Sequence, residues 1–129
     1  MSIVVALLLA PAPVAEPVVF PNAFHGVWDA SAEACAGSHD DGRIAIGPKE
    51  VVYWESSGVP TEIFTAGERD IRVALAMSGE GEEWKSQTRF VIDQSGTTLF
   101  SEQLPQAGEE YSSGKWFYTR CPSSTKFRP

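Results

Sequence analysis

The chain has 129 residues, enough for one domain of ordinary size. Apolar residues make up 43% of it and charged residues 21%, values that are typical of a globular protein and exclude a disordered one. Its 10 basic and 17 acidic residues give a net charge of -7, which disfavours nucleic acid and anionic membrane surfaces as partners. We interpret the acidity mainly as a contribution to solubility, and a basic protein is the electrostatically easier partner.

Residues 1–15 predict a secretory signal peptide. An apolar run from Ile3 to Ala10 is followed by small residues and prolines. The run is shorter than the roughly 20 residues that span a bilayer, so we expect a periplasmic or secreted protein without stable membrane insertion. Cleavage after Ala12 and cleavage after Ala15 both fit the pattern of small residues, and the sequence leaves the cleavage site open.

Residues 16–23 predict an extended entry segment, because the prolines at positions 17 and 21 favour extended backbone in the residues before them. We expect one domain from residue 24 to residue 129. A short helical turn is predicted after the first strand in Asp29–Gly37, with Asp29 or Ser31 as its N-cap.

Alternation of apolar and polar residues dominates the rest of the chain, as in half-buried strands. In residues 71–77 and 84–92 every second side chain is expected to face the interior, and Gly, Pro or Asp residues mark turns between such runs. The predicted strands are residues 24–30, 43–47, 50–56, 59–66, 70–77, 83–92, 97–102 and 114–121. Short, evenly spaced strands without crossover helices predict an all-β antiparallel meander that closes into a small barrel of about eight strands.

The two cysteines, Cys35 and Cys121, predict a disulfide, because an even number of cysteines in an exported chain most simply pairs. The bond would close a loop of about 86 residues and stabilise the fold by roughly 4 kcal/mol. A zinc site is the alternative, since Cys35 and His39 have zinc-like spacing and His25 and Cys121 could complete the ligands. We favour the disulfide and expect no metal site.

Gly26-Val27-Trp28 opens the first predicted strand. This Gly-x-Trp motif resembles the first-strand signature of the lipocalin, or calycin, superfamily, and the chain is similar in size to small bacterial exported proteins of this type. The resemblance implies that Trp28 closes one end of the barrel and that Arg120, on the last strand, stacks on its ring with a cation–π energy of about 1–2 kcal/mol. Gly26 would permit the close approach. The chain is shorter than typical lipocalins and lacks their long helix, so the resemblance implies fold more than ligand.

The sequence contains no Gly-x-Ser-x-Gly, no His-Glu-x-x-His and no Gly-rich phosphate loop, so we expect neither an enzyme nor a cofactor. An eight-strand barrel is either filled by its side chains or holds one small ligand. The first functional hypothesis is a binding module for a small apolar or aromatic ligand, with Tyr53, Trp54 and Trp84 as candidate lining residues. Tyr53 and Trp54 face opposite ways on one strand, which places these two candidates in conflict.

The second hypothesis is a protein-interaction module, such as an inhibitor of a cationic periplasmic enzyme. Small bacterial lysozyme inhibitors are disulfide-bearing eight-strand barrels, and an acidic chain suits a basic partner. Residues 112–118, Ser-Ser-Gly-Lys-Trp-Phe-Tyr, are loosely similar to the Ser-Gly-x-x-Tyr loop of those inhibitors.

Overall fold

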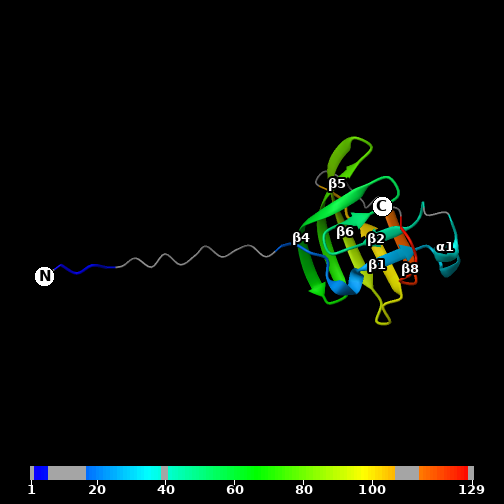
Figure 1. Ribbon diagram of the computed structural model, residues 1–129, viewed down its shortest axis with the longest axis horizontal. Coiled ribbons are helices and arrows are strands. Elements are labelled where there is room, and N and C mark those ends of the chain that lie inside the picture. The colour runs from blue at the N-terminus through cyan, green and yellow to red at the C-terminus, as the bar shows by residue number, and fades with distance from the viewer. Residues whose placement is uncertain (1, 6–16, 39–40, 107–113, 128–129) are drawn as a thin grey trace.

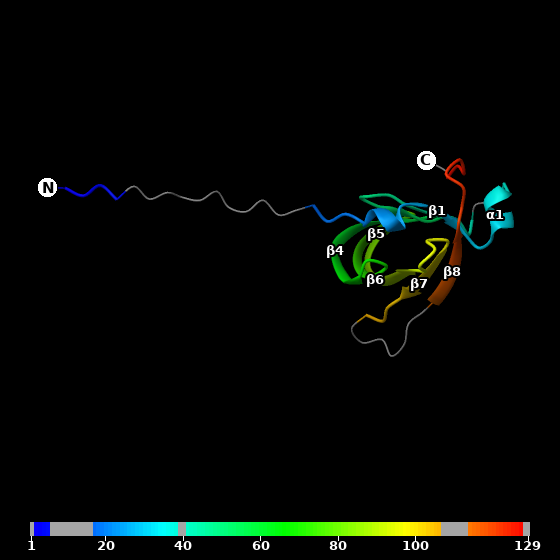
Figure 2. The same cartoon turned by 90° about the horizontal axis from the view of Figure 1, so that it is seen from below.

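Eight antiparallel strands form a closed barrel in which each strand pairs with its neighbours in the sequence and the last strand pairs with the first (Figures 1 and 2). The computed structural model describes residues 2–5, 17–38, 41–106 and 114–127. The strands are β1 (Gly26–Asp29), β2 (Ile44–Ile46), β3 (Val51–Val52), β4 (Ser57–Gly67), β5 (Asp70–Gly79), β6 (Glu82–Ile92), β7 (Thr98–Gln103) and β8 (Gly114–Arg120). The predicted fold class, an all-β meander barrel of about eight strands, is therefore confirmed.

The predicted helical turn is present as the short helix α1 (Ala32–Ala36). The Ser31 hydroxyl accepts a hydrogen bond from the Ala34 backbone N–H at 3.1 Å, so Ser31 is the N-cap. Both views place α1 outside the barrel wall, beside β1 and β8 (Figures 1 and 2). No helix within the described part of the chain is long and apolar enough to cross a membrane.

The strand predicted at residues 50–56 is much shorter than expected. β3 holds only Val51 and Val52, because the Tyr53 N–H then donates to the Ser56 carbonyl at 2.8 Å and closes a turn. This turn packs on the end of β5, where a Cβ atom added to Gly79 would lie 2.5 Å from the Glu55 carbonyl oxygen. The prediction that Tyr53 and Trp54 lie on a strand is wrong for this reason.

The entry segment is also not simply extended. Residues Asn22–Phe24 form a 3-10 turn, η1, in which the Phe24 N–H donates to the Pro21 carbonyl at 3.0 Å. The Phe20 N–H donates to the Pro48 carbonyl at 2.8 Å, and the Phe20 and Phe24 rings are fully buried. This segment therefore contributes two aromatic side chains to the core, in addition to those from the strands.

The core fills one half of the barrel. Alternation along β5 and β6 turns every second side chain inward, as the sequence predicted. The buried apolar cluster comprises Phe20, Phe24, Trp28, Ile44, Ile46, Val51, Ile71, Val73, Leu75, Met77, Phe90, Ile92 and Leu99. The Phe20 and Phe90 rings meet edge to face at 6.1 Å, which joins the entry segment to the barrel wall.

Candidate functional site

Trp28 lies at the filled end of the barrel and has no exposed surface. Its indole Nε1 donates a hydrogen bond to the Phe24 carbonyl at 3.1 Å, so its one polar atom is paired. The Arg120 guanidinium lies over the ring at 4.2 Å from its centroid, within the range of a cation–π contact. Trp28 and Arg120 are directly opposite residues of β1 and β8, so the stack joins the first strand to the last.

Arg120 also hydrogen-bonds three backbone carbonyls around this end. Its Nε donates to Gly96, Nη1 to His25 and Nη2 to Ala23, each at 2.7 Å. Gly26 has a φ of +141°, and a Cβ atom there would lie 2.9 Å from Arg120 Nη1. Glycine at this position therefore permits both the backbone conformation and the close approach of the guanidinium. Partial burial lowers the pKa of Arg120 below its ordinary value.

A disulfide joins Cys35 and Cys121, with their Cα atoms 5.4 Å apart, so the predicted pairing is confirmed. Cys35 is therefore not a zinc ligand, and His39, its expected partner in that alternative, lies outside the described residues. The bond attaches the end of α1 to the residue that follows β8. It thus reinforces the same junction of first and last strands that Arg120 and Trp28 hold.

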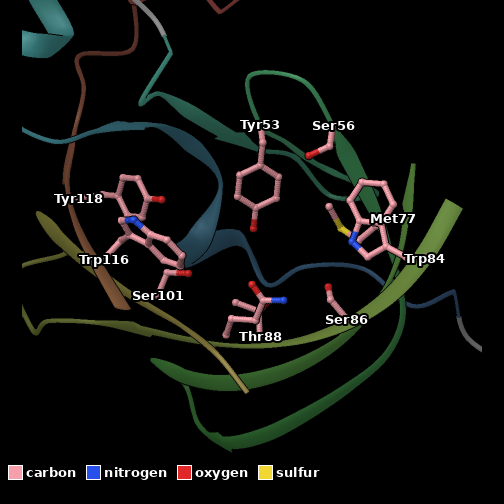
Figure 3. A pocket seen from close by; sticks show the side chains of 10 residues that line it. Tyr53, Ser56, Met77, Trp84, Ser86, Thr88, Ser101, Trp116 and Tyr118 are labelled. Carbon is pink, nitrogen blue, oxygen red and sulfur yellow. The ribbon is translucent and has the colours of Figure 1, made fainter. Parts of the chain in front are cut away.

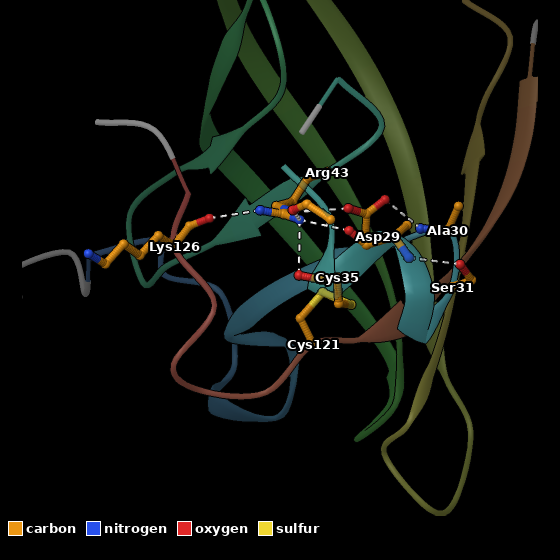
Figure 4. Close-up of polar contacts among 9 residues, drawn as sticks. Asp29, Ala30, Ser31, Cys35, Arg43, Cys121 and Lys126 are labelled. Carbon is orange, nitrogen blue, oxygen red and sulfur yellow. Dashed lines mark hydrogen bonds and ion pairs between the residues drawn. A yellow bond between two sulfur atoms is a disulfide. The ribbon is translucent and has the colours of Figure 1, made fainter. Parts of the chain in front are cut away.

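A buried ion pair lies beside the disulfide (Figure 4). Arg43 Nε donates to Asp29 Oδ2 at 3.0 Å, and both side chains are almost fully enclosed. The other Arg43 nitrogens donate to the carbonyls of Lys126 at 2.9 Å and Cys35 at 3.1 Å, and to two further carbonyls around the end of α1. The sequence analysis did not identify this cluster, whose role is to hold α1 and the C-terminal segment against the barrel.

The opposite half of the barrel contains a cavity of about 290 Å³ (Figure 3). It lies among the first residues of β6 and β8 and the last residues of β5 and β7, the ends farthest from Arg120. The side chains that line it are Tyr53, Ser56, Met77, Trp84, Ser86, Thr88, Ser101, Gln103, Trp116 and Tyr118. The barrel is thus packed at one end and hollow at the other.

Four aromatic side chains form much of the cavity wall. Trp84 and Trp116 are 41% and 48% exposed and lie on opposite sides of the space (Figure 3). Burial, with a smaller contribution from Tyr118, raises the pKa of the Tyr53 hydroxyl far above its ordinary value of 10.0. Burial, and then the negative charge of Asp29, raises the pKa of Tyr118. Both phenols are therefore neutral at physiological pH and are able to donate as well as accept hydrogen bonds.

Three further hydroxyls face the cavity from the inside of β6 and β7. Ser86, Thr88 and Ser101 are only 6%, 6% and 4% exposed, and none of them makes a side-chain hydrogen bond to another described residue. No described polar side-chain atom is both sealed from solvent and unpaired, so these hydroxyls are reached from the cavity. Figure 3 shows Ser86 and Thr88 across the space from Tyr53, whose hydroxyl points toward the middle.

The structure brings two of the three predicted lining residues together. Tyr53 and Trp84 line the cavity, whereas Trp54, 41% exposed on the turn after β3, does not. The conflict that the sequence indicated between Tyr53 and Trp54 is thus resolved in favour of Tyr53, which the turn closed with Ser56 holds in the cavity wall. Sequence reasoning did not select Trp116 and Tyr118, although alternation along the last strand places both of them on one face.

The described side chains offer no arrangement for metal chemistry. Within residues 17–38, 41–106 and 114–127, no three His, Cys, Asp or Glu side chains gather closely enough to hold a metal ion. His25 Nε2 is hydrogen-bonded to the Phe20 carbonyl at 2.7 Å, at the filled end and away from the cavity. The described side chains that line the cavity bear hydroxyls, an amide, a thioether and aromatic rings, which bind and orient a molecule.

The fold and the cavity define a closed eight-stranded antiparallel β-barrel that is packed at one end and has a ligand-sized hollow at the other. In comparisons with known proteins, the chain matches no family model, no curated protein and no solved structure.

Proposed function

We propose that the protein is an exported, non-catalytic barrel of the calycin type that binds one small molecule of aromatic character in its open end. The observation that carries the proposal is the cavity of about 290 Å³ in a barrel whose other half is closely packed. This volume lies near the lower limit of small-molecule sites. The occupant is accordingly small.

The composition of the cavity wall supports binding over a purely structural role. Apolar side chains in place of Ser86, Thr88 and Ser101 would continue the core and stabilise the barrel. Hydroxyls that lack protein partners and empty space between side chains both reduce stability. A bound molecule that fills the space and pairs the hydroxyls offsets this loss.

Two features support the calycin type and the exported location. The arrangement of Gly26, Trp28 and Arg120 at the packed end is the one that the resemblance implies. The disulfide is compatible with an oxidising compartment, which agrees with a signal peptide at residues 1–15. A test of export is the N-terminal sequence of the mature protein, which we expect to begin after Ala12 or Ala15.

The alternative, an inhibitor of a cationic enzyme, has support from the net charge of -7. Ser112 and Ser113, which belong to its loosely matching motif, lie outside the described residues. The described remainder of that motif, residues 114–118, belongs to β8, and its Trp116 and Tyr118 line the cavity. The same segment thus supports small-molecule binding more directly.

Native mass spectrometry tests the proposal on protein purified from the exported fraction of its own source. We expect the wild type to carry a small-molecule mass that Thr88→Leu lacks, because the larger apolar side chain enters the cavity. Gln87→Leu is the matched control, since Gln87 is exposed on the outer face of the same strand. It should retain the mass.

The uncharged fluorescent probe N-phenyl-1-naphthylamine provides a second readout. Its fluorescence should rise with wild type and Gln87→Leu, and much less with Thr88→Leu. A wild type that carries no small molecule and does not bind the probe would contradict the proposal. Recovery of a basic protein in place of a small molecule would favour the inhibitor function.

A further inference from the structure

Among the described residues, no charged side chain lines the cavity, although the chain as a whole is acidic. The ten described residues that line it bear hydroxyl, amide, thioether or aromatic groups. A carboxylate or ammonium group that entered the cavity would lose hydration and find no opposite charge there. The occupant is therefore uncharged.

The apolar part of the wall is flat. Trp84 and Trp116 present indole rings from opposite sides of the cavity, and Met77, beside Trp84, is the one aliphatic residue among those that line it (Figure 3). The branched aliphatic side chains are gathered in the packed half. Aromatic faces and a thioether favour a planar ring over a flexible acyl chain.

The polar part of the wall consists of groups that donate and accept equally. Tyr53, Ser86, Thr88, Ser101 and Tyr118 each bring one hydroxyl, and they come from four separate segments around the space. A planar molecule pairs with such groups through substituents on its edge. Hydroxyl substituents suit them best, because they too donate and accept.

We propose that the cavity binds an uncharged aromatic ring with hydroxyl groups on its edge, a phenol-type molecule of one or two rings. The ring lies against Trp84 and Trp116, and its hydroxyls pair with Tyr53 and with the hydroxyls of β6 and β7. This inference rests on the proposed function and narrows the class of ligand.

Four compounds that share one ring system test it by equilibrium dialysis at neutral pH: naphthalene, 2-naphthol, 2,7-dihydroxynaphthalene and 2-naphthoate. A hydroxyl makes transfer out of water less favourable, so tighter binding of the hydroxylated compounds must arise from partners in the cavity. We expect about fivefold tighter binding for each hydroxyl that is paired. The charged 2-naphthoate should bind at least about 100-fold more weakly than 2-naphthol.

Two variants remove one hydroxyl each with little change of shape: Tyr53→Phe and Thr88→Val. Each should reduce the preference for 2,7-dihydroxynaphthalene over naphthalene by about fivefold and leave the affinity for naphthalene unchanged. Thr98→Val is the matched control, because Thr98 lies on the outer face of β7 and makes no side-chain hydrogen bond to a described residue. It should change neither affinity, and a variant that merely distorts the cavity would weaken both ligands alike.

The inference is overturned if naphthalene binds as tightly as the two hydroxylated compounds, or if neither hydroxyl-removing variant alters their ratio. It is also overturned if methyl glucoside binds as tightly as 2-naphthol with the same dependence on Tyr53 and Thr88, since the ligand would then be a sugar. If none of these compounds binds but the native protein retains another small molecule, the ligand class is wrong and the binding function stands. An empty native protein that binds none of the compounds contradicts both.

Discussion

Replacing Arg120 with alanine removes every contact that the guanidinium makes at the packed end of the barrel. The cation–π contact with Trp28 contributes about 1–2 kcal/mol at a partly desolvated site. Each hydrogen bond from a charged donor to the carbonyls of Gly96, His25 and Ala23 contributes about 1–2 kcal/mol. Water is able to replace part of these bonds because Arg120 is only half-buried, so we expect Arg120→Ala to lower the free energy of unfolding by about 3 kcal/mol.

Urea unfolding of the oxidised protein, followed by far-ultraviolet circular dichroism, measures this loss. With a dependence of about 1.5 kcal/mol per molar urea, the midpoint should fall by about 2 M. Arg120→Lys keeps the charge but lacks the planar fork that reaches three carbonyls, so we expect about half of the loss. Arg72→Ala is the matched control, because Arg72 is exposed on the outer face of β5, and it should cost less than about 0.5 kcal/mol.

If the midpoints of Arg120→Ala and Arg72→Ala coincide, Arg120 does not hold the first and last strands together. A loss for Arg120→Lys as large as that for Arg120→Ala would mean that the positive charge over Trp28 contributes little. The energy would then belong to the hydrogen bonds.

Three other predictions concern the same barrel. Gly26→Ala should lower the free energy of unfolding by about 1–3 kcal/mol, because alanine disfavours the φ of +141° and its Cβ meets Arg120 Nη1; an unchanged urea midpoint would contradict this. Titration of the denatured, unreduced protein with a thiol reagent should find no free thiol, and two free thiols would contradict the disulfide. Replacing both Cys35 and Cys121 with serine should lower the free energy of unfolding by about 4 kcal/mol. The pKa of Tyr53 in the folded state is raised above the ordinary value of 10.0, so its contribution to stability is complete below pH 10 and is lost as the pH rises above it. Unfolding midpoints measured from pH 9 to 11 should therefore fall less steeply for Tyr53→Phe than for the wild type, and parallel slopes would show that Tyr53 is not desolvated.

Much of the barrel could be predicted from the sequence because alternation reports burial directly. In β5 the side chains of Ile71, Val73 and Leu75 point inward and Arg72 outward, and one pairing register satisfies all of them. The length of β3 could not be predicted in this way. Residues 50–56 are apolar on both faces and resemble a strand, but the turn at Tyr53–Ser56 is decided by packing on Gly79, which lies far along the chain.

The candidate site was harder to predict because the same pattern is compatible with two structures. Alternation along β6 places Trp84, Ser86 and Thr88 on the inner face, but an inward hydroxyl is as consistent with a paired core residue as with a cavity. Which one occurs depends on the volume that the opposite walls leave. That volume depends on Trp116 of β8 and on the turn that holds Tyr53, neither of which local sequence determines.

In strand β6, the residues that stabilise the barrel are different from those that line the cavity. Toward the end of the strand, Phe90 and Ile92 belong to the buried cluster of the filled half. Two and four residues before Phe90, the same inner face bears Thr88 and Ser86, whose hydroxyls open on the cavity. One regular strand thus contributes side chains both to the core and to the cavity wall. The packed half therefore holds the lining hydroxyls in place without being part of the site. Substitutions at Arg120 or Gly26 should therefore lower the free energy of unfolding and leave the preference among ligands unchanged, whereas Thr88→Val should change that preference without lowering the free energy of unfolding.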